Sequence, residues 1–205
     1  MTEGDRGPGL SEADLGPDPI ARFLAWLEEA RAAGSVFPEA AALATVDRGG
    51  RPAVRHVLVK VIDERGLTFF MNRKSRKGRH LAENPNAAAA FYWREIDRQV
   101  CVTGTATAIA VEETEAYFRT RPREARLAAW ASMQSRPVGS REELDAAYAA
   151  AARRFPDDVP SPPHWGGYRL EPDTVEFWKG REHRLHDRFR FTREAAGWRL
   201  ERLWP

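Results

Sequence analysis

The stretch that decides the fold is residues 41–71, AALATVDRGGRPAVRHVLVKVIDERGLTFFM. It contains three strand-like segments, at residues 41–46, 53–62 and 67–71. Asp47-Arg48-Gly49-Gly50 and Asp63-Glu64-Arg65-Gly66 separate them, and such clusters of Asp and Gly are typical of tight turns. Strands joined only by short turns indicate an antiparallel meander.

The segments before and after this stretch extend the same pattern. Residues 1–18 are rich in Gly, Pro and acidic residues and predict a flexible tail, and Asp18-Pro19 predicts the start of an amphipathic helix. Ser75 is suited to cap a helix that runs to about Asn84. Further strands are predicted at 87–93 and 99–110, helices at 111–155 with breaks at Pro122 and Pro137, and three or four strands at 166–203 with turns at Gly180 and Gly197.

Strands that bracket a helical insertion predict one continuous domain over residues 19–205, behind the tail at 1–18. The expected class is mainly β with α (α+β), an antiparallel barrel with helices packed outside it. A doubly wound sheet is disfavoured because the strands follow one another without helices between them.

Composition narrows the possible partners. Hydrophobic residues make up 42% of the 205 residues, which is typical of a globular chain. No apolar run approaches the roughly 20 residues of a membrane-spanning helix, and the N-terminal residues do not resemble a signal peptide. Cys101 is the single cysteine, so an intrachain disulfide and a multi-cysteine metal site are excluded. With a net charge of +2, we expect a cytoplasmic protein that binds neither membranes nor nucleic acid.

The segment Glu182-His183-Arg184-Leu185-His186-Asp187-Arg188-Phe189-Arg190-Phe191 is the most informative for function. If it is a strand, alternation places Leu185, Phe189 and Phe191 on a core face. The opposite face then carries Arg184, His186, Arg188 and Arg190. Such a row is typical of a site for an anionic, planar ligand, and equally of a solvated edge strand. A metal site at His183 and His186 is disfavoured, because no carboxylate cluster completes it.

Three other places carry basic or phenolic side chains. Tyr117 and Arg121 are four residues apart on a predicted helix and form either a phosphate clamp or a surface stack. The basic turn at 72–78 runs into a helix start, which favours a phosphate over a merely solvated turn. Alternation puts Arg55 and Lys60 on opposite strand faces, so either a bulge intervenes or they serve different groups.

Several familiar motifs are absent. The chain has no G-x-G-x-x-G fingerprint after a strand, no P-loop, and no Ser or Cys nucleophile motif. The chemistry is therefore expected to belong to a cofactor that side chains hold in place.

In their order along the chain, these segments resemble the pyridoxine/pyridoxamine 5′-phosphate oxidases, which use FMN. The resemblance runs from about Asp18 to Pro205. Its marks are Arg55-His56-Val57-Leu58-Val59-Lys60, Ser75-Arg76-Lys77-Gly78, Asn84-Pro85, Arg98-Gln99-Val100, Tyr117-Phe118, Arg121-Pro122, Gln134-Ser135, Trp165-Gly166-Gly167, Glu176-Phe177-Trp178, Arg184-Leu185-His186-Asp187-Arg188-Phe189 and Arg202-Leu203.

The resemblance implies an FMN-binding split-barrel homodimer with FMN at the subunit interface. The residues implied as cofactor contacts are Arg55, Lys60, Phe70, Met71, Arg76, Lys77, Gln99, Gln134, Ser135, Trp178 and Arg188. Lys60, Tyr117 and Arg121 are implied to grip the substrate phosphate, and Arg184 and His186 to bind the pyridine ring at the reacting centre. No metal is implied.

The implied reaction is oxidation of pyridoxamine or pyridoxine 5′-phosphate to pyridoxal 5′-phosphate, with O2 as acceptor and H2O2 as product. Two departures from the family are present: Met71 replaces a usual hydroxyl residue, and Ala125 replaces a Ser that donates to the substrate phosphate. Two alternatives stay open. One is a related flavin oxidase that aromatises phenazine precursors, and the other is a non-catalytic FMN- or pyridoxal-phosphate-binding protein on the same barrel.

Overall fold

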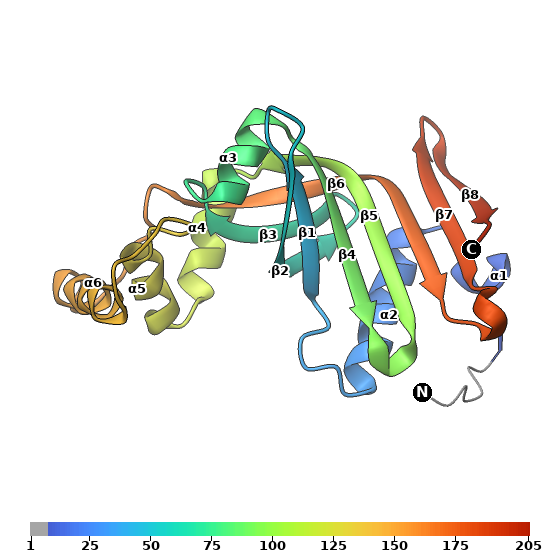
Figure 1. The fold of residues 1–205 in the computed structure, drawn as a ribbon, viewed down its shortest axis with the longest axis horizontal. Helices are drawn as coiled ribbons and strands as arrows, with labels where there is room; N and C mark the ends of the chain where they lie inside the picture. The colour runs from blue at the N-terminus through green and yellow to red at the C-terminus, as the bar shows by residue number, and fades with distance from the viewer. Residues whose placement is uncertain (1–7) are drawn as a thin grey trace.

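The computed structural model describes residues 8–205. Its strands form one antiparallel sheet in the order β3-β2-β1-β4-β5-β6-β7-β8 (Figure 1). Because β3 also pairs with β6, the first six strands in this order close into a barrel, and β7 and β8 extend beyond it. The strands are β1 (Ala40–Val46), β2 (Pro52–Asp63), β3 (Gly66–Asn72), β4 (Asn86–Trp93), β5 (Arg98–Ala108), β6 (Trp165–Lys179), β7 (Asp187–Glu194) and β8 (Gly197–Leu203).

The helices lie outside the barrel, as the sequence predicts (Figure 1). They are α1 (Glu12–Leu15), α2 (Pro19–Ala32), α3 (Arg76–Glu83), α4 (Val111–Thr120), α5 (Arg123–Ala131) and α6 (Arg141–Arg154), with short 3-10 turns η1 (Arg94–Ile96) and η2 (Glu182–Arg184). Asp18 caps α2 by accepting from the Ile20 N–H, and Ser75 caps α3 by accepting from the Gly78 N–H. The predicted mainly-β barrel with peripheral helices is confirmed.

The meander at residues 41–71 forms as its turns predict. Gly66 closes the β2–β3 turn at a φ of 129°, and a Cβ there would lie 2.2 Å from the Leu170 carbonyl oxygen. Only glycine meets both conditions. The bulge allowed by the Arg55–Lys60 spacing is present, because the β2–β3 register shifts between Val59 and Val61.

Aromatic side chains from α2 close the barrel core. Phe23 and Trp26 are buried and meet Phe91 of β4 and Phe177 of β6 at centroid distances of 4.8 and 5.0 Å. Both contacts are edge-on, the arrangement that ring quadrupoles favour. Helix α2 is thereby fixed to the sheet.

Strand β6 connects the barrel to its extension. The first part, Trp165–Leu170, pairs with β3, whereas the last part, Thr174–Lys179, pairs with β7. Side chains at the two ends of β6 therefore belong to different parts of the molecule. None of the helices at residues 8–205 has the length and apolar character needed to span a bilayer.

Two expectations are wrong. Residues 8–18 are not a flexible tail: they include α1, Leu10 and Leu15 are buried, and the Leu10 N–H donates to Asp187 at 2.9 Å. The packing of two leucines explains why this polar, Gly- and Pro-rich stretch is ordered. Residues 1–7 lie outside the described part of the chain.

The second concerns Leu185, which the alternation placed in the core. It is 68% exposed, because His183 and Arg184 take positive φ values of 54° and 60° and β7 begins only at Asp187. Within β7 the alternation holds, since Phe189 and Phe191 are buried.

Candidate active site

A cavity of about 430 Å³ lies where β2, β3, α4 and α5 meet. Seven of the residues expected to bind substrate or cofactor line it: Lys60, Phe70, Met71, Lys77, Tyr117, Arg121 and Gln134. The first and the last of them, Lys60 and Gln134, are more than seventy residues apart in the chain. The fold therefore brings the expected phosphate clamp and several expected cofactor contacts to one cavity.

Arg121 is the least satisfied cation at this cavity. Its Nη1 is buried without a hydrogen-bond partner, and no carboxylate of residues 8–205 pairs with it. Its guanidinium lies over the Trp165 ring, 4.9 Å from the centroid. Burial lowers the pKa of Arg121, while the nearby Tyr117 raises it. A half-buried guanidinium with one buried nitrogen unpaired and no carboxylate partner is unfavourable, so this wall fits an anionic ligand.

Tyr117 is held flat beside the same ligand space. Its ring stacks on Phe70 at a centroid distance of 3.9 Å and an interplanar angle of 15°. Burial raises the pKa of the Tyr117 phenol, so the hydroxyl remains a proton donor at neutral pH. A phenol O–H beside Arg121 can donate to an anion that the guanidinium attracts.

Lys60 lies at the β2 bulge and lines the cavity, and its ion pair with Glu39 is long. Its Nζ is 3.4 Å from Glu39 Oε1, at the long end for an ion pair. Its side chain is 30% exposed, so this pair contributes little and Lys60 can turn to another anion. Arg55, on the same strand, does not line the cavity.

Arg55, Arg76 and Lys77 form a cationic cluster at the start of α3. Burial, with the charge of Arg55, lowers the pKa of Lys77 to about 8, and burial with the charge of Arg76 lowers the pKa of Arg55. Lys77 Nζ donates to Gln134 Oε1 at 2.8 Å, a neutral partner. Within the described residues no carboxylate pairs with the three cations. Like charges held at a helix N-terminus fit a phosphate group.

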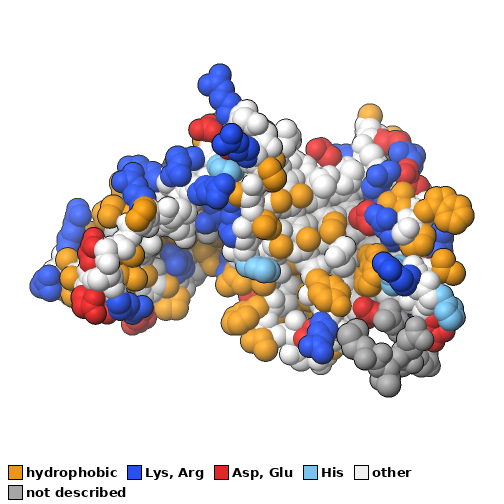
Figure 2. All heavy atoms as spheres, in the orientation of Figure 1, with side chains coloured by type: hydrophobic (Ala, Val, Ile, Leu, Met, Phe, Trp, Pro, Cys, Tyr) orange, Lys and Arg blue, Asp and Glu red, His pale blue; other side chains and the backbone are white. Residues whose placement is uncertain are grey.

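Figure 2 shows where charged and hydrophobic side chains lie on one face of the molecule. Lys and Arg side chains gather over the side of the molecule that carries α3, α5 and α6, whereas hydrophobic side chains are spread over the barrel strands (Figure 2). Val54 of β2 and Tyr92 of β4 are among the exposed apolar groups, at 68% and 58%.

A second group of expected contacts lies along β5, β6 and β7. Gln99 is opposite Trp178, and Trp178 is opposite Arg188. Arg188 pairs with Glu176 at 2.8 Å. The His186 ring lies 4.8 Å from the Trp178 ring. These four expected site residues therefore form one neighbourhood.

Arg184 and His186 do not reach the cavity within one chain. They lie at η2 and the start of β7, on the opposite side of the barrel from α4 and α5 (Figure 1). His186 Nδ1 accepts from the Arg181 N–H at 3.1 Å, so its ring proton is on Nε2. Ser135 has a φ of 72° and lines a smaller neighbouring cavity of about 200 Å³, which Gln134 also borders.

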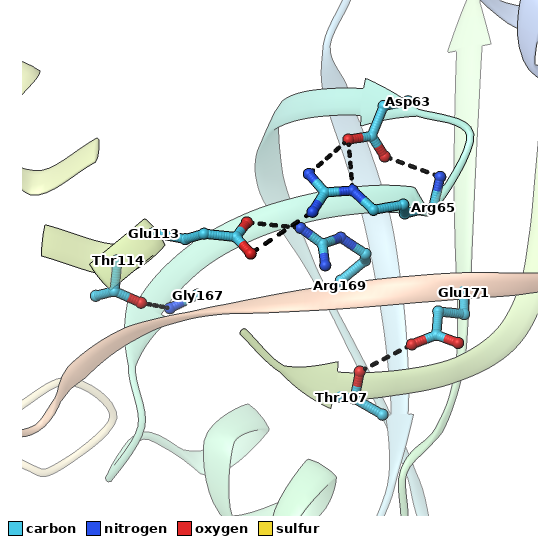
Figure 3. A network of polar contacts seen from close by, with 8 residues as sticks. All are labelled: Asp63, Arg65, Thr107, Glu113, Thr114, Gly167, Arg169 and Glu171. Atoms are coloured by element: carbon cyan, nitrogen blue, oxygen red, sulfur yellow. Dashed lines mark hydrogen bonds and ion pairs between the residues drawn. The ribbon is translucent and has the colours of Figure 1, made fainter. Parts of the chain in front are cut away.

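A polar network fixes α4, which carries Tyr117 (Figure 3). Glu113 of α4 pairs with Arg169 of β6 at 2.8 Å and with Arg65 at 3.6 Å. Thr114 Oγ1 accepts from the Gly167 N–H at 3.3 Å. The first turn of α4 is therefore attached to β6 at two residues and to the β2–β3 turn.

Reasoning from the sequence missed Trp165 as a member of the site. It is 6% exposed, lines the cavity, and lies nearly parallel to Phe70 at 5.3 Å and 9°. The Trp-Gly-Gly motif was noted, but nothing local shows that this tryptophan lies under Arg121. His56, Asn72 and Ala125 also line the cavity.

Comparisons with known proteins show the family of this chain. Residues 28–155 match the family model described as pyridoxamine 5′-phosphate oxidase. The chain belongs to the pyridoxamine 5′-phosphate oxidase family. Residues 165–205 match a second model, the pyridoxine 5′-phosphate oxidase C-terminal dimerisation region. The family and its named members indicate an oxidoreductase of the pyridoxamine phosphate oxidase type.

Individual relatives of this oxidase family are similar over nearly the whole chain. Pyridoxine/pyridoxamine 5′-phosphate oxidase of Rubrobacter xylanophilus is 52% identical over 198 residues, 96% of this chain and 91% of the relative. The protein of that name in Burkholderia multivorans is 52% identical over 199 residues, 96% and 93% of the two chains.

Among solved structures, PhzG from Burkholderia lata, in complex with tetrahydrophenazine-1-carboxylic acid, superposes with a TM-score of 0.89. It is 35% identical, and the match covers 96% of this chain and 98% of PhzG. A pyridoxamine 5′-phosphate oxidase-related, FMN-binding protein from Nostoc punctiforme has a TM-score of 0.74 at 20% identity, over 92% and 98% of the chains. At that identity the likeness supports the fold alone.

Proposed function

We propose that this protein oxidises pyridoxamine or pyridoxine 5′-phosphate to pyridoxal 5′-phosphate, with FMN as cofactor and O2 as electron acceptor. The observation that carries the proposal is Arg121, whose buried Nη1 has no hydrogen-bond partner among the described residues, beside Tyr117 and Lys60 in one cavity. Phe70, Lys77 and Gln134 line the same cavity. A guanidinium, a phenol and an ammonium at one wall suit a phosphate monoester.

The cationic cluster at α3 supports the cofactor. Arg55, Arg76 and Lys77 would hold the FMN phosphate, because they have no carboxylate partner among the described residues. Phe70, Met71, Gln134 and Ser135 would bind the remainder of the cofactor from the same side. Met71 lines the cavity, so its thioether would offer the flavin an apolar contact and no hydroxyl.

The second group of residues would complete the site from another subunit. The match of residues 165–205 to a dimerisation region supports a homodimer. In that homodimer Gln99, Trp178 and Arg188 of one chain would meet the cavity of its partner. Arg184 and His186 would then lie against the pyridine ring, and the exposed apolar side chains on β2 and β4 would be covered.

The roles of the chain's own groups follow from this arrangement. Lys60, Tyr117 and Arg121 fix the phosphate and so set the register of the substrate, while Arg184 and His186 orient its ring. FMN held by Arg55, Arg76 and Lys77 would supply two-electron oxidation at the substrate C4′ carbon, with O2 as the final acceptor that is reduced to H2O2. The alcohol of pyridoxine 5′-phosphate would also lose its hydroxyl proton, and the imine formed from pyridoxamine 5′-phosphate would be hydrolysed by water to the aldehyde and ammonia. The covered cavity would keep bulk water away from the reacting carbon.

The likeness to PhzG favours one second candidate, oxidation of a phenazine precursor. Arg121, with an unpaired buried nitrogen, favours a phosphorylated substrate instead, together with Tyr117 and Lys60. Turnover of pyridoxine 5′-phosphate compared with that of tetrahydrophenazine-1-carboxylic acid separates the two. Preference for the phenazine compound would replace the leading proposal.

The direct test is aerobic conversion. Purified protein should be yellow and should form pyridoxal phosphate and peroxide in equal amounts from pyridoxine 5′-phosphate. Lys60→Ala should raise KM by roughly 10- to 100-fold through the lost charged hydrogen bond. Lys74→Ala, in the nearby basic turn but outside the cavity lining, is the matched control and should be unchanged. Protein that stays colourless with added FMN would disprove the proposal.

A further inference from the structure

Two buried side chains with no role in the proposed reaction lie behind Arg55. Thr45 of β1 is 0% exposed and His80 of α3 is 6% exposed. Arg55 Nη1 donates to the Thr45 hydroxyl at 2.7 Å, and that hydroxyl lies 3.3 Å from His80 Nδ1. One hydrogen-bonded chain therefore links β2, β1 and α3.

The direction of the hydrogen bond between Arg55 and Thr45 follows from the groups themselves. A guanidinium only donates, so the Thr45 oxygen accepts from Arg55. The same hydroxyl is within hydrogen-bond distance of His80 Nδ1, and the tautomer of the imidazole decides which of the two groups donates. Arg55 Nη1 also donates to the Leu43 carbonyl at 3.1 Å. One end of the guanidinium is thus fixed against β1.

The charge of the group that holds Arg55 decides how much positive charge remains for a bound anion. Arg55 lies in the cluster with Arg76 and Lys77, whose like charges disfavour one another. A carboxylate anchor would hold Arg55 but cancel its charge. The Thr45 hydroxyl holds the guanidinium without adding a negative charge, so it leaves the positive charge of Arg55 for a ligand. Polar groups buried at this depth are stable only when they are hydrogen-bonded, so they also fix one geometry.

We propose that Thr45 and His80 are positioning residues that hold the Arg55 guanidinium toward the phosphate of the flavin cofactor. The inference rests on the proposed function, because it takes FMN as the ligand of the cationic cluster. It extends that function to two residues that touch neither cofactor nor substrate and act through Arg55.

The test titrates apoprotein with FMN and, in parallel, with riboflavin, which lacks the phosphate. Binding is followed by quenching of flavin fluorescence. Thr45→Val removes the hydroxyl at constant volume and should raise the Kd for FMN about tenfold, the scale of one hydrogen bond to a charged group. The Kd for riboflavin should change less than about twofold, while Thr45→Ser should restore FMN binding to within about threefold of wild type.

A second pair of variants moves the measurement to α3 in case Thr45→Val fails to fold. His80→Asn keeps a hydrogen-bonding amide near the Nδ1 position, and His80→Leu removes hydrogen bonding there. FMN affinity should fall more in His80→Leu than in His80→Asn, again without a matching loss for riboflavin. Equal losses for both flavins, or equal behaviour within each pair, would overturn the positioning role. Wild-type apoprotein that binds no FMN would instead remove the proposed function itself.

Discussion

The guanidinium of Arg121 lies over the ring of Trp165, 4.9 Å from its centroid, and one of its nitrogens is buried without a partner. Trp165 is the first residue of β6 and Arg121 directly follows α4, so the contact joins the barrel to the helical insertion. The tryptophan supports the cation from below without neutralising it. The guanidinium therefore keeps its charge for a ligand.

Trp165→Leu should weaken substrate binding more than catalysis. Loss of the cation–π contact, worth about 0.5–2 kcal/mol, should raise KM for pyridoxine 5′-phosphate roughly 2- to 30-fold. The turnover number kcat should change less, because Trp165 does not touch the reacting carbon in the proposed site. Trp165→Phe keeps an aromatic face and should recover most of the affinity. Steady-state kinetics on the three proteins is the measurement, and a fall in kcat at constant KM would contradict this role.

A substitution at Ala125 should strengthen substrate binding. It lines the cavity together with Tyr117 and Arg121 and presents only a methyl group. Ala125→Ser adds a hydroxyl donor at this wall and should lower KM for the phosphorylated substrate by up to about tenfold, through one added hydrogen bond. Ala128→Ser, one turn along the same wall, is the comparison variant. If Ala125→Ser raised KM, the phosphate would not lie against this part of α5.

Lys77 predicts how FMN affinity depends on pH. Its pKa is lowered to about 8, chiefly by burial and then by the charge of Arg55. A bound phosphate would raise that pKa, so binding above pH 8 requires proton uptake and the Kd for FMN should increase as pH rises through about 8. Lys77→Arg stays protonated and should remove this inflection. Titrations of apoprotein between about pH 6.5 and 9.5 measure it, and an unchanged inflection in the arginine variant would assign it to another group.

The same pKa has a consequence for stability. Because the folded-state pKa of Lys77 lies below its ordinary value of 10.5, unfolded chains bind more protons between about pH 8 and 10.5. In that window the contribution of Lys77 to the free energy of unfolding rises with pH. Below pH 8 Lys77 is charged, and a phosphate that pairs with it offsets the free-energy cost of burying that charge. Added FMN should therefore stabilise the apoprotein more below pH 8 than above it.

Much of the fold could be predicted because its signals are local. Turns with Asp and Gly, the Asp18 and Ser75 caps, and the breaks at Pro122 and Pro137 each act within a few residues. Residues 8–18 and Leu185 were predicted wrongly because their structure depends on features that their local sequence pattern does not show. The order of residues 8–18 depends on the contact of Leu10 with Asp187. The exposure of Leu185 depends on the positive φ values of His183 and Arg184.

The site could be predicted only in part. Tyr117 and Arg121 are visible from helical spacing. Trp165 beside Arg121 and the Arg55–Thr45–His80 chain arise from contacts between elements that are distant in the sequence. The remaining residues fall into two neighbourhoods on opposite sides of one chain, the cavity and the β5–β6–β7 face. No spacing within a sequence specifies which residues meet across a subunit interface.

The most direct test of a site shared between two chains is complementation between inactive variants. Lys60→Ala/Arg121→Ala disables the clamp and Arg184→Ala disables the ring contact, so each homodimer should have little activity. Hybrid dimers from co-expression, purified with two different tags, should each contain one intact site and recover about half of the wild-type activity. Hybrids no more active than either parent would contradict the claim that the clamp and Arg184 come from different subunits.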